Sequence, residues 1–268
     1  APPEVIGGEP MRGQFPEVVY LTDQTGTVPC TGVLIAQHTV LTARHCLADG
    51  AGLESTTVRF GDDRKNPIFK TKVVAVEPMP ENYPPDVTAP VASDLALVRL
   101  ESQPSNVKPV SIASAARLAA NAAVRVVGFG RSIVGVTERA AFGRKFSARL
   151  IVATNDCRGT VTRRSSGETL DDKDFYLCDP NEIVAAGRID KGTRRPADTC
   201  KGDSGGPAYV SLLRPSAPGQ NFERAFERTG ILNYAVAGIT SRGIRSGHIR
   251  SSDEWSCGQG SIYTRLSE

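Results

Sequence analysis

The hydrophobic positions of the chain fall into short runs that alternate with polar turns, a pattern typical of β-strands. The runs are rich in Val, Ile, Leu, Thr and Tyr, and clusters of Gly, Pro, Asp, Asn or Ser separate many of them. The sequence predicts strands at residues 17–21, 31–35, 39–42, 73–77, 95–100, 124–127, 150–154, 207–212, 234–240 and 261–265. Many short strands with turns between them favour a sandwich or barrel over a parallel sheet with crossover helices.

Other segments do not follow the strand pattern. Residues 112–124 read IASAARLAANAAV, an alanine-rich run with high helix propensity that also fits a connection between two strand-rich halves, and the sequence does not decide between these. Polar stretches rich in Pro, Gly, Ser, Arg and Asp predict surface loops at residues 78–90, 158–174, 185–197, 214–228 and 244–256. Loops of this length in a compact domain usually carry function or move.

The composition is that of a globular domain and carries little sign of nucleic-acid or membrane partners. The 268 residues are 40% hydrophobic and 23% charged, enough for one large domain or two small ones. Thirty-two basic residues nearly balance 29 acidic ones, so a net charge of +3 does not indicate a nucleic-acid partner. No apolar run approaches the roughly 18 residues that cross a bilayer. The first four residues, APPE, have none of the features of a signal peptide.

The cysteines indicate disulfides and therefore an oxidising compartment. None of the six forms a C-x-x-C motif, and three histidines in the whole chain leave little material for a zinc site. We expect three disulfides, and the sequence alone does not choose the pairing. The cysteines are Cys30, Cys46, Cys157, Cys178, Cys200 and Cys257.

Three short motifs carry the residues that acyl transfer requires. LTARHC contains His45, SDLALV contains Asp94, and CKGDSGGP contains Ser204. A serine hydroxyl is a weak nucleophile at neutral pH, so an imidazole must take its proton during attack. A buried carboxylate holds that imidazole in one tautomer, and backbone N–H groups near Gly202 and Ser204 are placed to receive the oxyanion.

These motifs, in the order His, Asp, Ser, resemble those of the trypsin-like (chymotrypsin-fold) serine proteases, and the resemblance extends from Val5 to about Arg265. It implies an all-β fold of two antiparallel six-stranded β-barrels with the active site in the cleft between them. Residues 5–115 would form the N-terminal barrel and residues 116–268 the C-terminal one, together one peptidase domain. It also implies the disulfides Cys30–Cys46, Cys157–Cys178 and Cys200–Cys257.

The resemblance further implies activation by cleavage. The segment VIGG, which begins at Val5, resembles the family's mature amino terminus, whose ammonium pairs with the acid before the nucleophile, here Asp203. Residues 1–4 would then be a propeptide remnant, or the chain a zymogen; a harmless extension is the plainer alternative. Cleavage would follow Glu4 and not the Arg or Lys usual in the family, so the sequence does not identify the activating protease.

The expected specificity pocket departs from the family pattern at two positions. Asp198 stands where trypsin-type members keep the carboxylate that selects Arg or Lys, and Ser241 and Gly243 match the strand that pairs with substrate. Ser261 replaces a usual glycine, which would narrow the pocket. Arg242 replaces a customary aromatic residue and puts a cation near the pocket mouth. The loops at residues 158–174, 179–197 and 244–256 look longer than in compact members. The sequence ends at Glu268, before the family's terminal helix; either the domain continues further or this member is shorter, and the sequence does not decide between these.

Taken together, the sequence predicts a serine endopeptidase that cleaves after Arg or Lys through an acyl-enzyme and needs no metal or organic cofactor. Its partners would be protein or peptide substrates, an activating protease and protein inhibitors, in an extracellular or periplasmic setting. A catalytically silent binding or regulatory protein on the same fold is the main alternative. An α/β-hydrolase also carries G-x-S-x-G, as at residues 202–206, but its histidine follows the serine, and only His248 does so here.

Overall fold

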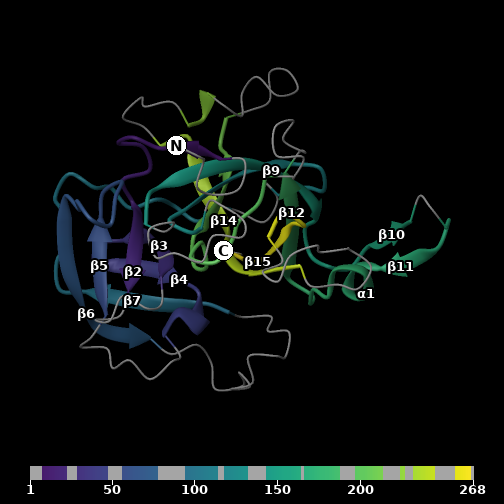
Figure 1. The fold of residues 1–268 in the computed structure, drawn as a ribbon, viewed down its shortest axis with the longest axis horizontal. Coiled ribbons are helices and arrows are strands. Elements are labelled where there is room, and N and C mark those ends of the chain that lie inside the picture. Colours follow the sequence, from purple (N-terminus) through teal and green to yellow (C-terminus); the bar gives the residue numbers. More distant parts are fainter. Residues whose placement is uncertain are drawn as a thin grey trace.

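Two closed antiparallel β-barrels make up most of the computed structural model (Figure 1). The two barrels confirm the all-β fold that the resemblance implied. The structure describes residues 8–22, 29–47, 56–77, 94–113, 118–131, 143–163, 166–187, 197–213, 224–226, 232–244 and 257–266. No helix among them is long and apolar enough to cross a membrane.

The first barrel uses strands from the N-terminal part of the chain, in the order β2-β3-β4-β7-β6-β5. Its strands are β2 (Val18–Thr22), β3 (Cys30–Ala36), β4 (Thr39–Thr42), β5 (Thr57–Phe60), β6 (Phe69–Glu77) and β7 (Ala96–Leu100). All five residues of β2 are buried, although successive side chains of a strand point to opposite faces. Val19 and Leu21 pack in the core of this barrel, whereas Val18 and Tyr20 pack in a second cluster with residues of the other barrel. Strand β2 is therefore hydrophobic on both faces because it borders both halves.

The second barrel is a sheet that closes when β8 pairs with both β13 and β9. Its strands are β8 (Ala123–Gly128), β9 (Phe146–Thr154), β12 (Glu182–Gly187), β13 (Pro207–Ser211), β14 (Tyr234–Gly243) and β15 (Ser261–Arg265). The short strand β1 (Glu9–Pro10) pairs with β9, so this N-terminal segment joins the second barrel, although the sequence analysis grouped it with the first.

The connection between the barrels touches both. Val110 N–H donates to the Leu34 carbonyl of β3 (3.0 Å), and Ala113 N–H donates to the Val236 carbonyl of β14 (2.8 Å). In the described part of the alanine-rich run, Ile112 forms an isolated bridge with Val236, and residues 118–122 contain no helix. The described residues therefore favour the connection over the helix; residues 114–117 lie outside the description.

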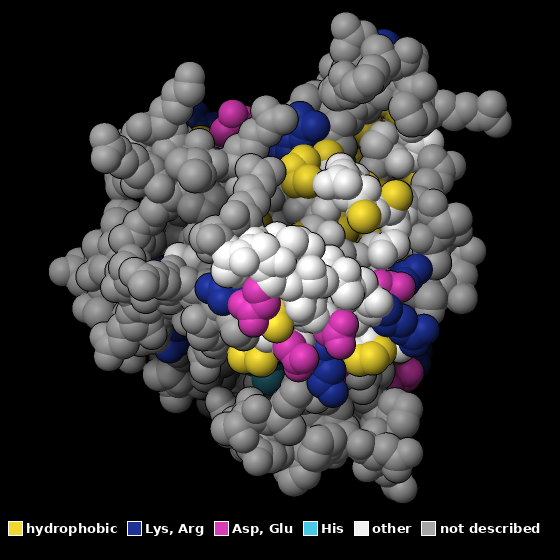
Figure 2. All heavy atoms as spheres, turned by 90° about the vertical axis from the view of Figure 1, so that its right-hand side faces the viewer, with side chains coloured by type: hydrophobic (Ala, Val, Ile, Leu, Met, Phe, Trp, Pro, Cys, Tyr) yellow, Lys and Arg dark blue, Asp and Glu magenta, His cyan; other side chains and the backbone are white. Residues whose placement is uncertain are grey.

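A hairpin and a short helix stand out from the second barrel beside β12 and β15 (Figure 1). They are β10 (Thr160–Thr162), β11 (Thr169–Asp171) and α1 (Asp172–Tyr176), and they occupy a segment that the sequence predicted as a loop. The Cys157–Cys178 disulfide closes this arm at its base. Figure 2, which faces this side of the molecule, shows acidic and basic side chains intermixed and not gathered by sign.

Candidate active site

His45 and Asp94 form a close pair at the edge of the first barrel. His45 lies in the short 3-10 helix η1 (Arg44–Leu47), directly after β4, and Asp94 lies two residues before β7. Strands β4 and β7 are paired neighbours, which brings the two residues together. His45 Nδ1 is 2.7 Å from Asp94 Oδ2, and His45 N–H donates to Asp94 Oδ1 at 3.0 Å.

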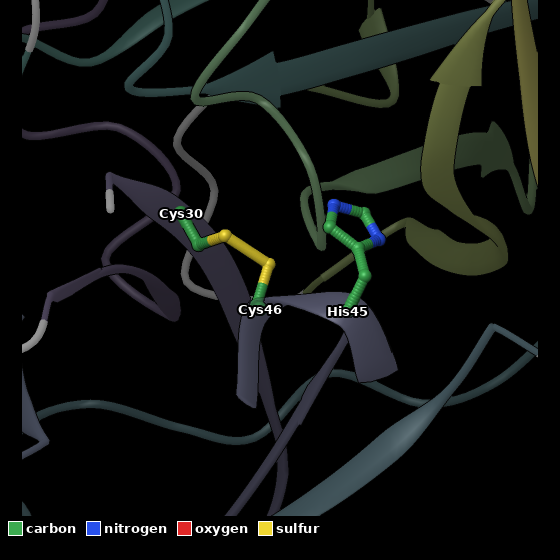
Figure 3. A group of neighbouring side chains, drawn as sticks. All are labelled: Cys30, His45 and Cys46. Atoms are coloured by element: carbon green, nitrogen blue, oxygen red, sulfur yellow. A yellow bond between two sulfur atoms is a disulfide. The ribbon is translucent and has the colours of Figure 1, made fainter. Parts of the chain in front are cut away.

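A disulfide fixes the turn that carries His45. Figure 3 shows the Cys30–Cys46 disulfide and the His45 ring rising from neighbouring positions, with Cys46 and His45 on η1 and Cys30 on β3. The ligand atoms of these three residues lie within 4.8 Å of one another, which resembles a metal site. Both sulfurs are oxidised in the disulfide and are not thiolates, so this group does not fit a metal ion. The bond instead ties the His45 turn to the barrel.

The electrostatics of Asp94 define the tautomer of His45. Burial alone would raise the pKa of Asp94, but the hydrogen bonds and charge of His45 and the hydroxyl of Ser241 outweigh it, and the pKa is lowered overall. An ionised carboxylate only accepts hydrogen bonds, so Nδ1 of His45 must donate. The other ring nitrogen, Nε2, then carries the lone pair that can take a proton. The His45 side chain is 35% exposed, so that nitrogen has access to the site.

Ser241 is a third contributor to this pair, although the sequence predicted for it only a place on the strand that pairs with substrate and forms a pocket wall. Its Oγ donates to Asp94 Oδ2 at 2.7 Å. The register between β14 and β15 shifts between Thr240 and Arg242, so Ser241 is the extra residue of a β-bulge. A bulge redirects a side chain that would otherwise follow the pleat. No signal in the sequence marks this bulge, which explains why the contact with Asp94 was not predicted.

Ser204 lies on a turn of the second barrel that packs against the first. It is half-buried, and its carbonyl accepts the N–H of Thr31 in β3 at 2.8 Å. The next residue, Gly205, has a φ of 83°, and a Cβ there would collide with the Thr31 carbonyl and the Thr42 hydroxyl. Only glycine therefore allows this approach. Since Thr42 ends the strand before η1, the approach sets Ser204 beside the turn that carries His45.

The backbone hydrogen bonds of residues 202–206 leave two amides for a ligand. The N–H groups of Asp203, Gly205 and Gly206 donate to the carbonyls of Cys200, Thr240 and Asp203, respectively. Within the described part of the chain, the N–H groups of Gly202 and Ser204 have no acceptor. Buried amides are almost always paired, so two amides without an acceptor beside a serine hydroxyl are suited to receive an oxyanion.

The acid before Ser204 is fully buried. Asp203 Oδ1 accepts Gly130 N–H at 2.8 Å, and Oδ2 accepts Cys200 N–H at 2.9 Å. This carboxylate therefore joins the turn of Ser204 to the end of β8. Val5, the residue that the resemblance pairs with Asp203, lies outside the described residues, as do the four residues before it.

Asp198 is enclosed by neutral donors. Its Oδ1 accepts the N–H of Thr199 (2.8 Å) and the hydroxyl of Ser261 (2.7 Å). Its Oδ2 accepts the N–H groups of Gly258 (2.8 Å) and Gly260 (3.0 Å). Burial raises the pKa of Asp198 to about 6, against the opposing effect of these four bonds. In the ranges that the structure covers, no Lys or Arg forms an ion pair with this carboxylate.

Comparison with known proteins identifies the family. A sequence model of the family described as Trypsin matches residues 5–250. The chain belongs to the trypsin family of serine proteases. Coagulation factor XII of Sus scrofa is 34% identical over 219 residues, which cover 76% of this chain and 32% of that protein. The chain thus spans about a third of the length of this relative.

Two further trypsin-family relatives are matched over more of their own length. Trypsin of Saccharopolyspora erythraea is 29% identical over 211 residues, which cover 77% of this chain and 82% of that protein. The Spaetzle-processing enzyme of Drosophila melanogaster is 27% identical over 262 residues, 87% of this chain and 57% of that protein. The similarity to relatives from a bacterium, an insect and a mammal supports the family assignment and leaves the substrate open.

Arg242, a departure from the family that the sequence predicted to put a cation near the pocket mouth, is paired with a buried carboxylate. Its guanidinium donates to both carboxylate oxygens of Glu182, at 2.6 and 2.8 Å, and to the Leu177 carbonyl at 3.2 Å. Glu182 is fully buried, and burial raises its pKa although Arg242 opposes this. The charge of Arg242 is therefore compensated from within the protein. Gly243, the next residue, pairs in register with Ser261 of β15.

Proposed function

We propose that this protein is a secreted serine endopeptidase in which Ser204 attacks the scissile carbonyl, His45 takes its proton and Asp94 orients the imidazole. The observation that carries the proposal is the Asp94–His45 pair beside a serine whose turn presents two amides without acceptors. Proximity and orientation of these groups supply much of the rate in acyl transfer.

The proposed reaction has two halves. Ser204 Oγ bonds to the carbonyl carbon as its proton moves to His45 Nε2, and the N–H groups of Gly202 and Ser204 receive the oxyanion. The imidazolium then protonates the leaving amine, which departs as the acyl-enzyme forms. Water attacks the acyl-enzyme with His45 again as base, releasing the acid and restoring Ser204.

The proposed preference is for Arg or Lys before the cleaved bond. Asp198 is a buried carboxylate whose described partners are all neutral, and a buried charge without a counter-charge is costly. A cationic substrate side chain would supply that counter-charge. Ser261, Ser241 and Gly243 would form the neighbouring walls.

We also propose that cleavage before Val5 activates the protein, because the family resemblance pairs the new ammonium with the acid before the nucleophile, here the buried Asp203. The oxyanion amides flank Asp203, so a change in its surroundings would reach them directly. The protease that performs this cleavage, and protein inhibitors of the mature form, would be partners. The three disulfides support an extracellular or periplasmic location, where such bonds persist.

The test compares the chain as given with a chain that begins at Val5, on chromogenic peptides ending in Arg, Lys, Phe or Ala. We expect hydrolysis after Arg and Lys by the Val5 form, and a loss of about 10⁶-fold in kcat with Ser204→Ala. Activity after Phe or Ala alone would keep the nucleophile and reject the Asp198 pocket. A folded Val5 form that cleaves nothing and is not labelled by a fluorophosphonate would reject the enzyme in favour of a binding protein.

A further inference from the structure

Thr31 connects the first barrel to the turn that carries Ser204. It is the second residue of β3, fully buried, and directly follows Cys30 of the disulfide beside His45. The reaction proposed above uses no atom of Thr31. Its contacts nevertheless converge on the two residues whose amides would receive the oxyanion.

Three hydrogen bonds define this connection. The N–H of Thr31 donates to the Ser204 carbonyl at 2.8 Å, and the Thr31 hydroxyl donates to the Gly202 carbonyl at 2.8 Å. The same hydroxyl accepts the N–H of Phe129, just after β8, at 3.1 Å. One side chain thus joins β3, the end of β8 and the Ser204 turn.

The position of these bonds in the turn determines what they hold. Gly202 O belongs to the peptide unit between Gly202 and Asp203, which lies between the two amides without acceptors. The Lys201 carbonyl is also engaged, by Arg131 N–H at 2.8 Å. In a trans peptide the N–H points opposite to the C=O, so the N–H of Gly202 is directed away from Arg131. Carbonyls on both sides of the Gly202 amide are therefore anchored.

We propose that Thr31 is a positioning residue for the oxyanion donors: its hydroxyl holds the Gly202 peptide so that the amides of Gly202 and Ser204 stay aimed at the reacting carbonyl. This inference rests on the function proposed above. Thr31 belongs to the first barrel, and its hydrogen bond holds the Gly202 carbonyl of a turn that belongs to the second barrel. Preorganised donors act chiefly on the transition state, so the effect of Thr31 falls on kcat.

The test uses two substitutions of Thr31 in the Val5 form. Thr31→Val keeps the shape of the side chain and removes the hydroxyl, which leaves the Gly202 carbonyl and the Phe129 amide without this partner. We expect kcat to fall roughly 10-fold with KM within about twofold, a loss in keeping with one buried hydrogen bond. Thr31→Ser keeps the hydroxyl and is expected to restore kcat to within about twofold of the wild type.

A matched control separates positioning from general destabilisation. Thr71 of β6 is also buried, and its hydroxyl bonds Ser102 N–H at 3.1 Å, in the first barrel and outside the proposed site. Thr71→Val removes an equivalent hydroxyl and is expected to lower stability without changing kcat. An equal fall of kcat in both valine variants would overturn the proposal.

Hydrogen exchange provides a readout that does not depend on activity. In Thr31→Val, and not in Thr31→Ser or Thr71→Val, we expect faster amide exchange in the peptide that covers residues 200–206, measured by mass spectrometry. Unchanged exchange together with unchanged kcat sinks the role of Thr31 while the protease assignment stands. If the wild type hydrolyses nothing, the proposed function fails, and exchange still decides whether Thr31 holds the turn.

Discussion

At the scale of single residues, the carboxylates around the site differ in the partners that surround them. Asp94 is bonded to an imidazole and a hydroxyl, and its pKa is lowered. Glu182 is bonded to the guanidinium of Arg242. Asp198 has only neutral donors around it, and burial raises its pKa to about 6. Burial therefore raises the pKa of Glu182 and Asp198, and only for Asp94 do the partners outweigh burial and lower the pKa.

This difference predicts how selectivity varies with pH. Asp198 is charged mainly above its pKa of about 6, so the preference for Arg over Ala before the cleaved bond should fall as the pH drops through that value. We expect the ratio of the two kcat/KM values to fall roughly 10-fold between about pH 7 and pH 5. The ratio cancels pH effects on the catalytic step that both substrates share. Asp198→Asn should give a low ratio at every pH; a flat wild-type ratio would contradict the prediction.

At the scale of elements, the sequence predicted the strands whose side chains alternate or form compact β-branched runs. The predicted ranges 39–42 and 261–265 coincide with β4 and β15. Strand β12 was missed because EIVAAG contains alanine and glycine and follows a polar stretch, although pairing with both β9 and β15 buries it. The hairpin β10–β11 was read as a loop for its polar composition. Strand β12 depends on partners that are distant in the sequence, whereas β10 and β11 pair with each other across a short polar turn.

The features of the candidate site also fall into two groups, those that the sequence predicted and those that it did not. His45, Asp94 and Ser204 were predicted because each lies in a short motif that can be read locally, and the three disulfides match the pairs that the resemblance implied. The contact of Ser241 with Asp94, the four donors around Asp198 and the Arg242–Glu182 pair were not predicted. The Ser241 contact depends on a bulge and the Arg242–Glu182 pair on the register between strands, while three of the Asp198 donors come from residues distant in the sequence; local sequence specifies none of these.

A buried carboxyl joins elements of the two halves and predicts a dependence of stability on pH. Glu17, directly before β2, accepts the hydroxyls of Tyr209 in β13 (2.7 Å) and Tyr234 in β14 (3.1 Å). Burial raises the pKa of Glu17 above 4.5, although the two tyrosines and the charge of Lys145 oppose this. The folded state therefore holds this proton more tightly than the unfolded chain does.

The stability that this proton provides is present below the unfolded pKa and is lost as the pH rises through the raised folded pKa. Glu17→Gln keeps an acceptor for the tyrosines and cannot ionise. The free energy of unfolding, measured with urea, should rise for Glu17→Gln relative to the wild type as the pH rises above 4.5. This difference should increase by at most about 1.4 kcal/mol per pH unit. Glu101→Gln, at an exposed site, serves as control. A constant difference between Glu17→Gln and wild type would refute the effect.

At the scale of the whole molecule, the two disulfides of the second half serve different regions. Cys157–Cys178 closes the arm of β10, β11 and α1, whereas Cys200–Cys257 joins the Ser204 turn to the segment whose amides bind Asp198. Their sequence separations of 21 and 57 residues imply similar stabilisation on the chain-entropy model, about 3 and about 4 kcal/mol.

Replacing each pair by alanines should therefore cost comparable stability but affect catalysis unequally. We expect the Cys200/Cys257 double variant to lose at least about 10-fold in kcat/KM on an Arg peptide, because a displacement near the reacting groups is costly. The Cys157/Cys178 variant should stay within about threefold, since its arm holds none of the proposed catalytic groups. Both are assayed well below their unfolding temperatures. Equal losses would show that the arm takes part in the reaction.

All three disulfides lie within one half of the molecule or the other, and none joins the two barrels. Covalent continuity between the halves therefore rests on the backbone alone, at the segment between β1 and β2 and at the connection between β7 and β8. If two related genes recombined within the connection between β7 and β8, the chimaera would take one barrel from each parent. Each barrel would bring both cysteines of each of its disulfides, so no cysteine would lose its partner. The chimaera would, however, need compatible noncovalent contacts between the two barrels. These include the hydrogen bonds of Thr31 with Ser204, Ser241 with Asp94 and Tyr209 with Glu17.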